Sequence, residues 1–90
     1  MKKSFSKAIK RIAYPITIVK DDNYYVVYIP DFDANTQGEN VADAMAMARD
    51  AIEMLCRYDQ DNGKPIPKPS NINDIAVDGD TILTLVDVSV

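Results

Sequence analysis

The sequence predicts an α+β fold in which one main helix lies on one face of a four-stranded sheet with strand order 3-2-1-4. Two segments with alternating apolar residues, 14–20 and 24–29, are typical of paired strands. One long amphipathic segment follows, and residues 81–88 close the chain with a run rich in β-branched side chains. With a short third strand and a short second helix, the element order is β-β-β-α-(α)-β. A right-handed crossover through the main helix would return the last strand parallel to the first, so a mixed sheet is predicted.

A basic arm, residues 1–13, is predicted to precede the domain formed by residues 14–90. The arm contains Phe5, Ile9 and Ile12 at helical spacing but no capping residue. One interpretation is a frayed, solvated terminus. The other is an arm that contacts nucleic acid through its basic residues.

A hairpin is predicted to begin after this arm. Ile16 and Ile18 share one face of its first strand. A polar turn at residues 21–23 leads into the second strand. A short third strand is expected at residues 33–36, before the chain enters the helix.

One helix is predicted for residues 41–59. Asn40 stands at the N-cap position, and Gly63 follows the end of the segment as a stop signal. The apolar residues recur at spacings of three and four, which places them on one face. These residues are Val41, Ala44, Met45, Ala48, Ile52 and Leu55.

A proline-rich connection, residues 64–70, follows the helix. Its three prolines alternate with other residues, which favours extended geometry over helix. Ser70 or Asn71 is expected to cap a short turn of helix that ends at Ile75. A turn at residues 78–80 then leads into the last strand.

Apolar side chains alternate on both faces of the second and last strands, although a single helix covers only one face. A face exposed to solvent would show polar residues at alternate positions. We therefore expect a second copy of the chain or a different protein to cover the other face. The alternative is that the arm and the proline-rich connection fold over it. The two sets in the second strand are Tyr25, Val27 and Ile29, and Tyr24, Val26 and Tyr28.

Charge is distributed unevenly along the 90 residues. Residues 1–20 carry six of the ten basic residues and no acid, whereas residues 21–90 carry four basic residues and all fourteen acids, a formal charge of −10. Nucleic-acid affinity depends mainly on phosphate neutralisation by basic side chains. The acidic body is therefore better suited to a basic protein partner.

Residue types that commonly carry catalysis are scarce. The chain has no histidine, and its single cysteine, Cys56, falls near the helix stripe and is interpreted as a packed thiol. Asp31 and Asp33 are near enough in sequence to bind a hard cation weakly. The same is true of Asp78 and Asp80, although turn formation and capping are the preferred interpretation for both pairs. No catalytic residue, metal site or cofactor is predicted.

The expected location is the cytoplasm. No apolar run is long enough to span a bilayer, and no long hydrophobic region follows the basic N-terminus, so neither a transmembrane segment nor a signal peptide is predicted. A single cysteine allows no internal disulfide, which fits a reducing compartment.

Residues 14–88 contain, in order, Tyr14-Pro15, an aromatic strand ending at Pro30-Asp31, Thr36-Gln37-Gly38, an alanine-rich helix and the proline-rich segment 65–70. In this order and spacing the chain resembles the HicB-type antitoxins of bacterial toxin–antitoxin pairs. The resemblance implies a partial ribonuclease H-like fold with the predicted sheet order. It does not imply nuclease activity, because the acidic metal constellation of an active nuclease is not evident.

The function implied by the resemblance is that of the antitoxin of a type II pair. Such a protein is non-catalytic and neutralises a small basic mRNA interferase toxin of HicA type by binding it. Family members usually continue into a C-terminal DNA-binding domain, which would begin near Val90, so DNA binding is not expected. One alternative is a stand-alone self-associating or adaptor domain of the same fold, with a homodimer through the sheet face or the last strand. A further alternative, suggested by fold analogy alone, is an enzyme of ribonuclease H type.

Toxin contacts are expected from acidic and aromatic side chains. They are inferred from charge and expected exposure. The predicted contact residues are Tyr24, Tyr28, Asp31, Asp33, Asp43, Asp50 and Glu53.

Overall fold

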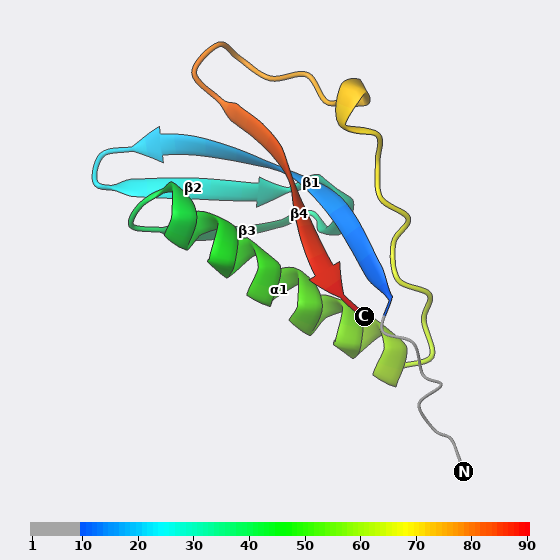
Figure 1. The fold of residues 1–90 in the computed structure, drawn as a ribbon. Helices are drawn as coiled ribbons and strands as arrows, with labels where there is room; N and C mark the ends of the chain where they lie inside the picture. The colour runs from blue at the N-terminus through cyan, green and yellow to red at the C-terminus, as the bar shows by residue number, and fades with distance from the viewer. Residues whose placement is uncertain (1–9) are drawn as a thin grey trace.

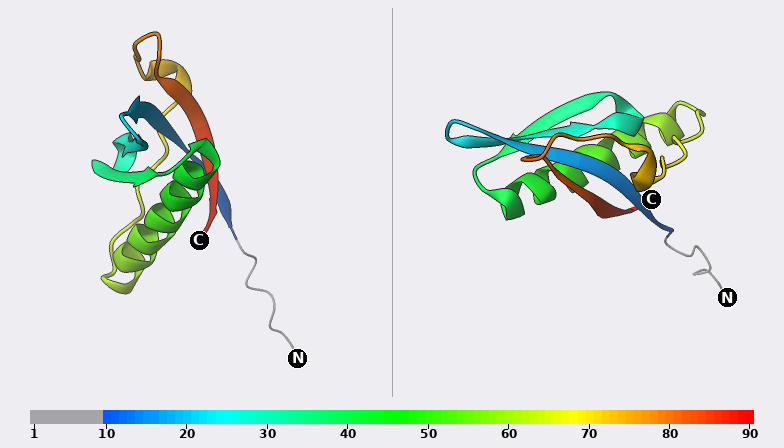
Figure 2. Two further views of the ribbon diagram at one scale, coloured as in Figure 1. Left: turned by 90° about the vertical axis from the view of Figure 1, so that its left-hand side faces the viewer. Right: turned by 90° about the horizontal axis from the view of Figure 1, so that it is seen from above.

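The computed structural model describes residues 10–90, which form a four-stranded sheet with one helix packed against one side of it (Figure 1, Figure 2). The predicted α+β class and the strand order β3-β2-β1-β4 are confirmed. The predicted second helix is a single 3₁₀ turn. The elements are β1 (Arg11–Asp21), β2 (Tyr24–Ile29), a 3₁₀ turn (Pro30–Phe32), β3 (Ala34–Gly38), α1 (Val41–Asp61), a second 3₁₀ turn (Ile72–Asp74) and β4 (Ile82–Ser89).

The prediction that the last strand runs parallel to the first, in a mixed sheet, is wrong. β4 pairs with β1 in antiparallel fashion, with Arg11 opposite Ser89 and Ile18 opposite Ile82. The prediction took α1 as the whole crossover between the two strands. In the structure, residues 62–81 run back along the sheet after α1 ends, before β4 begins (Figure 1). This second crossing reverses the direction in which the chain enters β4, so all strand pairs within residues 10–90 are antiparallel.

Strand β1 begins three residues earlier than the sequence predicted. Residues 11–13 therefore belong to the sheet, where they pair with the end of β4. The rest of the predicted arm, including Phe5 and Ile9, lies outside the described residues. Helix α1 begins as predicted and extends two residues beyond its predicted end.

The start of α1 follows the predicted capping pattern. Asn40 Oδ1 accepts a hydrogen bond from the backbone N–H of Asp43 at 2.7 Å, and Asp43 Oδ2 accepts one from the N–H of Glu39 at 2.9 Å. The first bond satisfies a donor that the helix itself leaves without a partner. Gly38 lies directly against this turn, because a Cβ there would stand 2.3 Å from the Ala44 nitrogen. Only a residue without a side chain fits where β3 meets the helix.

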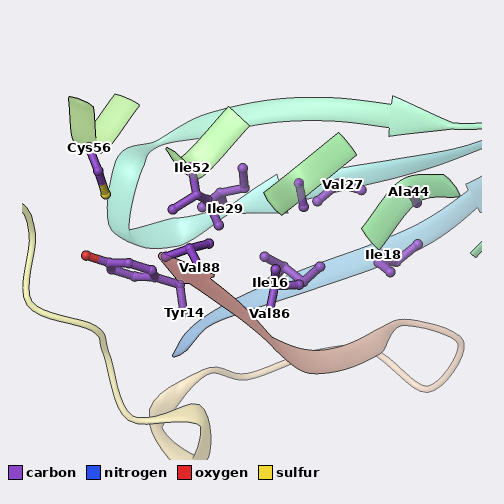
Figure 3. Packing of buried hydrophobic residues seen from close by; sticks show 11 residues of the cluster. Tyr14, Ile16, Ile18, Val27, Ile29, Ala44, Ile52, Cys56, Val86 and Val88 are labelled. Carbon is purple, nitrogen blue, oxygen red and sulfur yellow. The ribbon is translucent and has the colours of Figure 1, made fainter. Parts of the chain in front are cut away.

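The core lies between α1 and the sheet (Figure 3). Alternate residues of β1, β2 and β4 point toward the predicted apolar face of α1. Cys56 is buried among them, as the packed-thiol interpretation requires, and burial raises the pKa of its thiol. The buried apolar side chains are Tyr14, Ile16, Ile18, Val27, Ile29, Ala44, Ala48, Ile52, Cys56, Val86 and Val88.

Hydrogen bonds attach the middle of the connection of residues 62–81 to β1 and to the 3₁₀ turn after β2. The hydroxyl of Tyr14 donates a hydrogen bond to the Pro67 carbonyl at 2.6 Å, and the Tyr14 ring packs edge-on against Phe32, with ring centroids 5.0 Å apart. Asp31 accepts hydrogen bonds from the backbone N–H of Ser70, at 3.0 Å, and from its hydroxyl. These contacts hold the proline-rich segment beside one end of the sheet.

Candidate partner-binding surfaces

The sheet face opposite α1 carries exposed apolar side chains on three strands. Val19, Tyr24 and Tyr28 are 43%, 48% and 39% exposed, and Leu85 on the edge strand β4 is 45% exposed. They alternate with residues that fill the core, so they point away from the helix. We call the surface formed by these four residues the open face. The sequence predicted such an apolar face from the alternation in the second and last strands.

The end of the connection covers part of the open face. Residues 75–78 and the sheet together line a hollow of about 410 Å³. Thr17, Val19 and Tyr28 line it from the sheet, and Val77, which is 41% exposed, lines it from the connection. Residues 75–78 therefore cover part of this face, whereas the alternative expected from the sequence named the arm and the proline-rich segment.

An acidic turn borders the open face at the end of β2. Tyr28 donates a hydrogen bond from its hydroxyl to Asp33 Oδ1 at 3.0 Å, and this bond raises the pKa of Tyr28. Asp33 has a φ of 48°, in the left-handed region that a short polar side chain tolerates better than most. Its position beside Tyr28 is therefore fixed by the turn as well as by the hydrogen bond.

A second hollow, of about 330 Å³, lies between α1 and β3. Met47 and Met54 line it from the helix and are 41% and 59% exposed. Asp50 lies on the same side of the helix, and Asn35 and Thr36 line the hollow from β3. Methionine side chains adapt to irregular partner surfaces. We call this hollow the methionine groove.

The outer edge of β4 is tied to α1 near the end of the strand. Arg49 donates hydrogen bonds to the Asp87 carbonyl at 2.9 Å and to Asp87 Oδ1 at 3.1 Å, and Arg11 pairs with the same carboxylate. Hydrogen bonds from Arg11 and Arg49 lower the pKa of Asp87 below its ordinary value. Glu53 accepts a hydrogen bond from the backbone N–H of Ser89 at 2.9 Å. Side chains of the helix thus form hydrogen bonds with backbone groups that an edge strand otherwise exposes.

Four of the seven predicted contact residues lie on the open face or beside it. Tyr24 and Tyr28 point to the same side of β2, and Asp33 is bonded to Tyr28. Asp31 lies in the adjacent 3₁₀ turn, where its carboxylate is engaged with Ser70. The structure therefore places Tyr24 and Tyr28 on one face of β2, with Asp33 beside Tyr28.

The other three predicted contact residues lie along α1 in separate environments. Asp43 caps the first turn, Asp50 lines the methionine groove beside β3, and Glu53 binds the edge of β4. Sequence reasoning did not name Leu85 or Val77 as contacts. Alternation in the last strand could have identified Leu85, whereas the exposure of Val77 depends on the path of the connection.

Neither a membrane span nor a metal centre is found in the part of the chain that the structure describes. Within residues 10–90, no helix is long and apolar enough to cross a membrane. The same residues contain no group of three or more His, Cys, Asp or Glu side chains placed to hold a metal ion. Asp31 and Asp33, considered from the sequence as weak cation ligands, accept hydrogen bonds from Ser70 and Tyr28.

An α+β domain with an exposed apolar sheet face, a methionine-lined groove and an acidic surface has the features of a protein-binding domain. Comparison with known proteins gives its family. The family model described as "HicB_like antitoxin of bacterial toxin-antitoxin system" matches residues 13–85. The chain belongs to this HicB-like antitoxin family, as its sequence motifs indicated.

Two curated relatives carry the name Antitoxin HicB, one from Escherichia coli strain K12 and one from Escherichia coli O157:H7. Each is 36% identical to this chain over 62 residues, which cover 67% of this chain and 45% of the relative. The chain therefore spans less than half the length of the curated relatives it matches.

Two solved structures share the fold. A chain of a toxin–antitoxin complex from Streptococcus pneumoniae matches with a TM-score of 0.79 at 24% identity, covering 88% of this chain and 69% of that chain. A chain of a HicA3 and HicB3 toxin–antitoxin complex matches with a TM-score of 0.69 at 26% identity, covering 86% of this chain and 98% of that chain. These likenesses support the one-helix, four-stranded architecture.

Proposed function

We propose that this chain is the antitoxin of a type II toxin–antitoxin pair and neutralises a small basic HicA-type mRNA interferase by binding it. The observation that carries the proposal is the family match over residues 13–85. A structure with the same fold is described as a HicA3 and HicB3 toxin–antitoxin complex, which supports a HicA-type partner. On this proposal the chain is non-catalytic and acts in the cytoplasm, where the toxin would meet its RNA.

The charge of the domain supports a basic partner. Residues 21–90 carry a formal charge of −10, and one of their four basic residues, Arg49, is already paired with Asp87. Complementary charge mainly accelerates association and makes it sensitive to salt. Binding to a basic toxin should therefore weaken as the salt concentration rises, while apolar contacts at the open face or the methionine groove should be less affected.

A rescue assay tests the proposal directly. A HicA-type toxin encoded beside this gene is expressed with and without the 90-residue chain, and growth and RNA decay are followed. We expect the chain to restore growth and stop the decay. A toxin that still arrests growth while the chain is folded and abundant would refute the proposal.

Charge reversals distinguish the candidate toxin surfaces. Asp33→Lys changes the border of the open face, and Asp50→Lys changes the methionine groove. Asp61→Lys, at the exposed end of α1, is the matched control. We expect weaker toxin binding from the first or second variant and not from the control. Equal weakening by all three would show that net charge, not a defined surface, drives association.

The open face favours a second candidate function, a self-associating or adaptor domain with no toxin partner. Three of its four residues lie on the inner strands β1 and β2, where a solvated face normally carries polar side chains. Failure of the rescue assay together with a stable oligomer would favour this candidate. Rescue by a chain that stays monomeric would exclude it.

A further inference from the structure

The hydrogen-bond pattern of β4 defines which of its backbone groups face outward. Lys10 and Val90 exchange two backbone hydrogen bonds, at 3.4 and 2.9 Å. Pairs of this kind recur at every second residue of an antiparallel ladder. The even-numbered residues of β4 therefore direct their N–H and C=O groups toward β1. The residues that direct theirs away from the sheet are Leu83, Leu85, Asp87 and Ser89.

Intramolecular hydrogen bonds engage part of this outer edge on both sides of Leu83 and Leu85. Toward the chain end, side chains of α1 bind the Asp87 carbonyl and the Ser89 N–H. Toward the strand start, the N–H of Thr81 donates to a carbonyl of the preceding turn at 3.0 Å. Within residues 10–90, no hydrogen bond is found for the outward N–H and C=O groups of Leu83 and Leu85. We call these groups the edge window.

We propose that the edge window pairs with the same window of a second copy, so that two four-stranded sheets join into one continuous antiparallel sheet. With a two-fold axis at Thr84, Leu83 of one copy stands opposite Leu85 of the other. Every outward N–H and C=O of both windows then has a partner. A shift of the register to either side would place Thr81 or Asp87 opposite a window residue, and each of these has one outward group, the Thr81 N–H or the Asp87 carbonyl, that is already bonded. The register centred on Thr84 therefore gives every outward N–H and C=O group of both windows a hydrogen-bond partner.

The side chains that face one another across the axis in this register can pack favourably. Leu83 and Leu85 lie on the open-face side of β4 and would meet their symmetry mates across the axis. Thr84 would face its own mate on the helix side, and apolar and Thr–Thr cross-strand pairs stabilise antiparallel sheets. Ile82, which is 40% exposed, would become more buried against the second copy.

The charge pattern also favours self-pairing over toxin binding at this edge. Residues 81–86 contain no charged side chain. A second acidic copy is therefore not repelled by charges within the window, and a basic toxin finds no acid there to bind. The acidic residues lie elsewhere on the surface, so the inference does not depend on the proposed antitoxin function.

The test measures the mass of the full 90-residue chain across a range of concentrations by light scattering or sedimentation. We expect a species of twice the 10.0 kDa monomer mass. Leu85→Lys places a charge at the window and should return the mass to that of the monomer, because lysine on an edge strand opposes pairing. Val19→Lys is the matched control, since Val19 is similarly exposed on the same face but lies beyond the start of β4.

Amide hydrogen exchange gives a second readout that a general loss of structure would not imitate. In the dimer the amides of Leu83 and Leu85 should exchange slowly, and in Leu85→Lys the Leu83 amide should exchange fast. The Thr84 amide, which bonds to β1, should stay protected in both proteins.

Three outcomes would overturn the inference. The first is a chain that remains monomeric at every concentration. The second is a dimer that Val19→Lys dissociates and Leu85→Lys does not, which would assign the interface to the open face. The third is protection of Leu83 and Leu85 only after a HicA-type toxin is added, which would make the window a toxin site. The rescue assay is scored separately, so failure of the dimer and failure of the antitoxin function are distinguishable.

Discussion

Gly38→Ala should destabilise the domain strongly, because the end of β3 touches the backbone of α1. An alanine Cβ at this position would stand 2.3 Å from the Ala44 nitrogen, 2.6 Å from its Cα and 2.8 Å from the Asp43 carbonyl carbon. All three atoms belong to the helix backbone, so no side-chain rotation can relieve the clash. The first turn of α1 would have to move away from the sheet.

The expected cost follows from the size of that movement. Ordinary van der Waals contact for a Cβ begins at 3.4 Å, so the nearest atom must retreat by about 1 Å. Overpacking of this kind costs ~1–3 kcal/mol. A displaced helix start would also weaken the N-cap hydrogen bond of Asn40, which contributes about 1 kcal/mol. We therefore expect the free energy of unfolding to fall by about 3 kcal/mol. For a domain of this size that corresponds to a Tm lower by ~12–24 °C.

Urea and thermal unfolding, followed by far-UV circular dichroism, measure this effect. Gly79→Ala is the control, since the same Cβ at Gly79 has no atom within 4 Å and the residue lies in an open turn. We expect the control to stay within about 0.5 kcal/mol of the parent chain. If both variants unfold at the same midpoint, the close contact between β3 and α1 does not exist in solution and the reasoning fails.

Three further predictions concern single side chains. Tyr14→Phe removes the hydrogen bond to Pro67 and should lower the free energy of unfolding by about 1 kcal/mol in urea; an unchanged midpoint would show that the bond adds no stability. Because Arg11 and Arg49 lower the pKa of Asp87, its contribution to stability should be complete above the ordinary aspartate pKa of about 3.9 and be lost as the pH falls further. Asp87→Asn should therefore flatten the acid limb of a plot of Tm against pH, and an unaltered limb would contradict the assignment. Burial raises the pKa of Cys56, so a thiol reagent should label the native protein far more slowly than the unfolded chain, and equal rates would contradict its burial.

Local patterns in the sequence were sufficient to predict the hairpin and the helix. Asn40 caps α1 as expected, and the apolar stripe of the helix packs on the sheet except for Leu55, which lies outside the core cluster. The direction of β4 was not predictable in the same way, because it depends on contacts between residues far apart in the chain. The bond from Tyr14 to Pro67 and the bonds from Ser70 to Asp31 guide the connection back along the sheet. Neither pair shows a local signature.

The candidate surfaces were predictable only in part, for a related reason. Alternation revealed an apolar face, because period two in a strand is a local property. Charge and expected exposure did not reveal which acids share a surface. Asp50 and Glu53 are three residues apart, yet one lines a groove beside β3 and the other binds the edge of β4. Placement on a helix depends on how the helix crosses the sheet, which only the folded structure specifies.

The paired hydrogen bonds between Lys10 and Val90 make the domain a good candidate for circular permutation. These two residues are already neighbours, so a short linker could join them without disturbing the sheet. New termini could open in the exposed turn at residues 78–80. Such a permutant would place β4 before β1 in the chain as a hairpin. It would show whether the long connection is needed for the fold or only for the order in which the strands are synthesised.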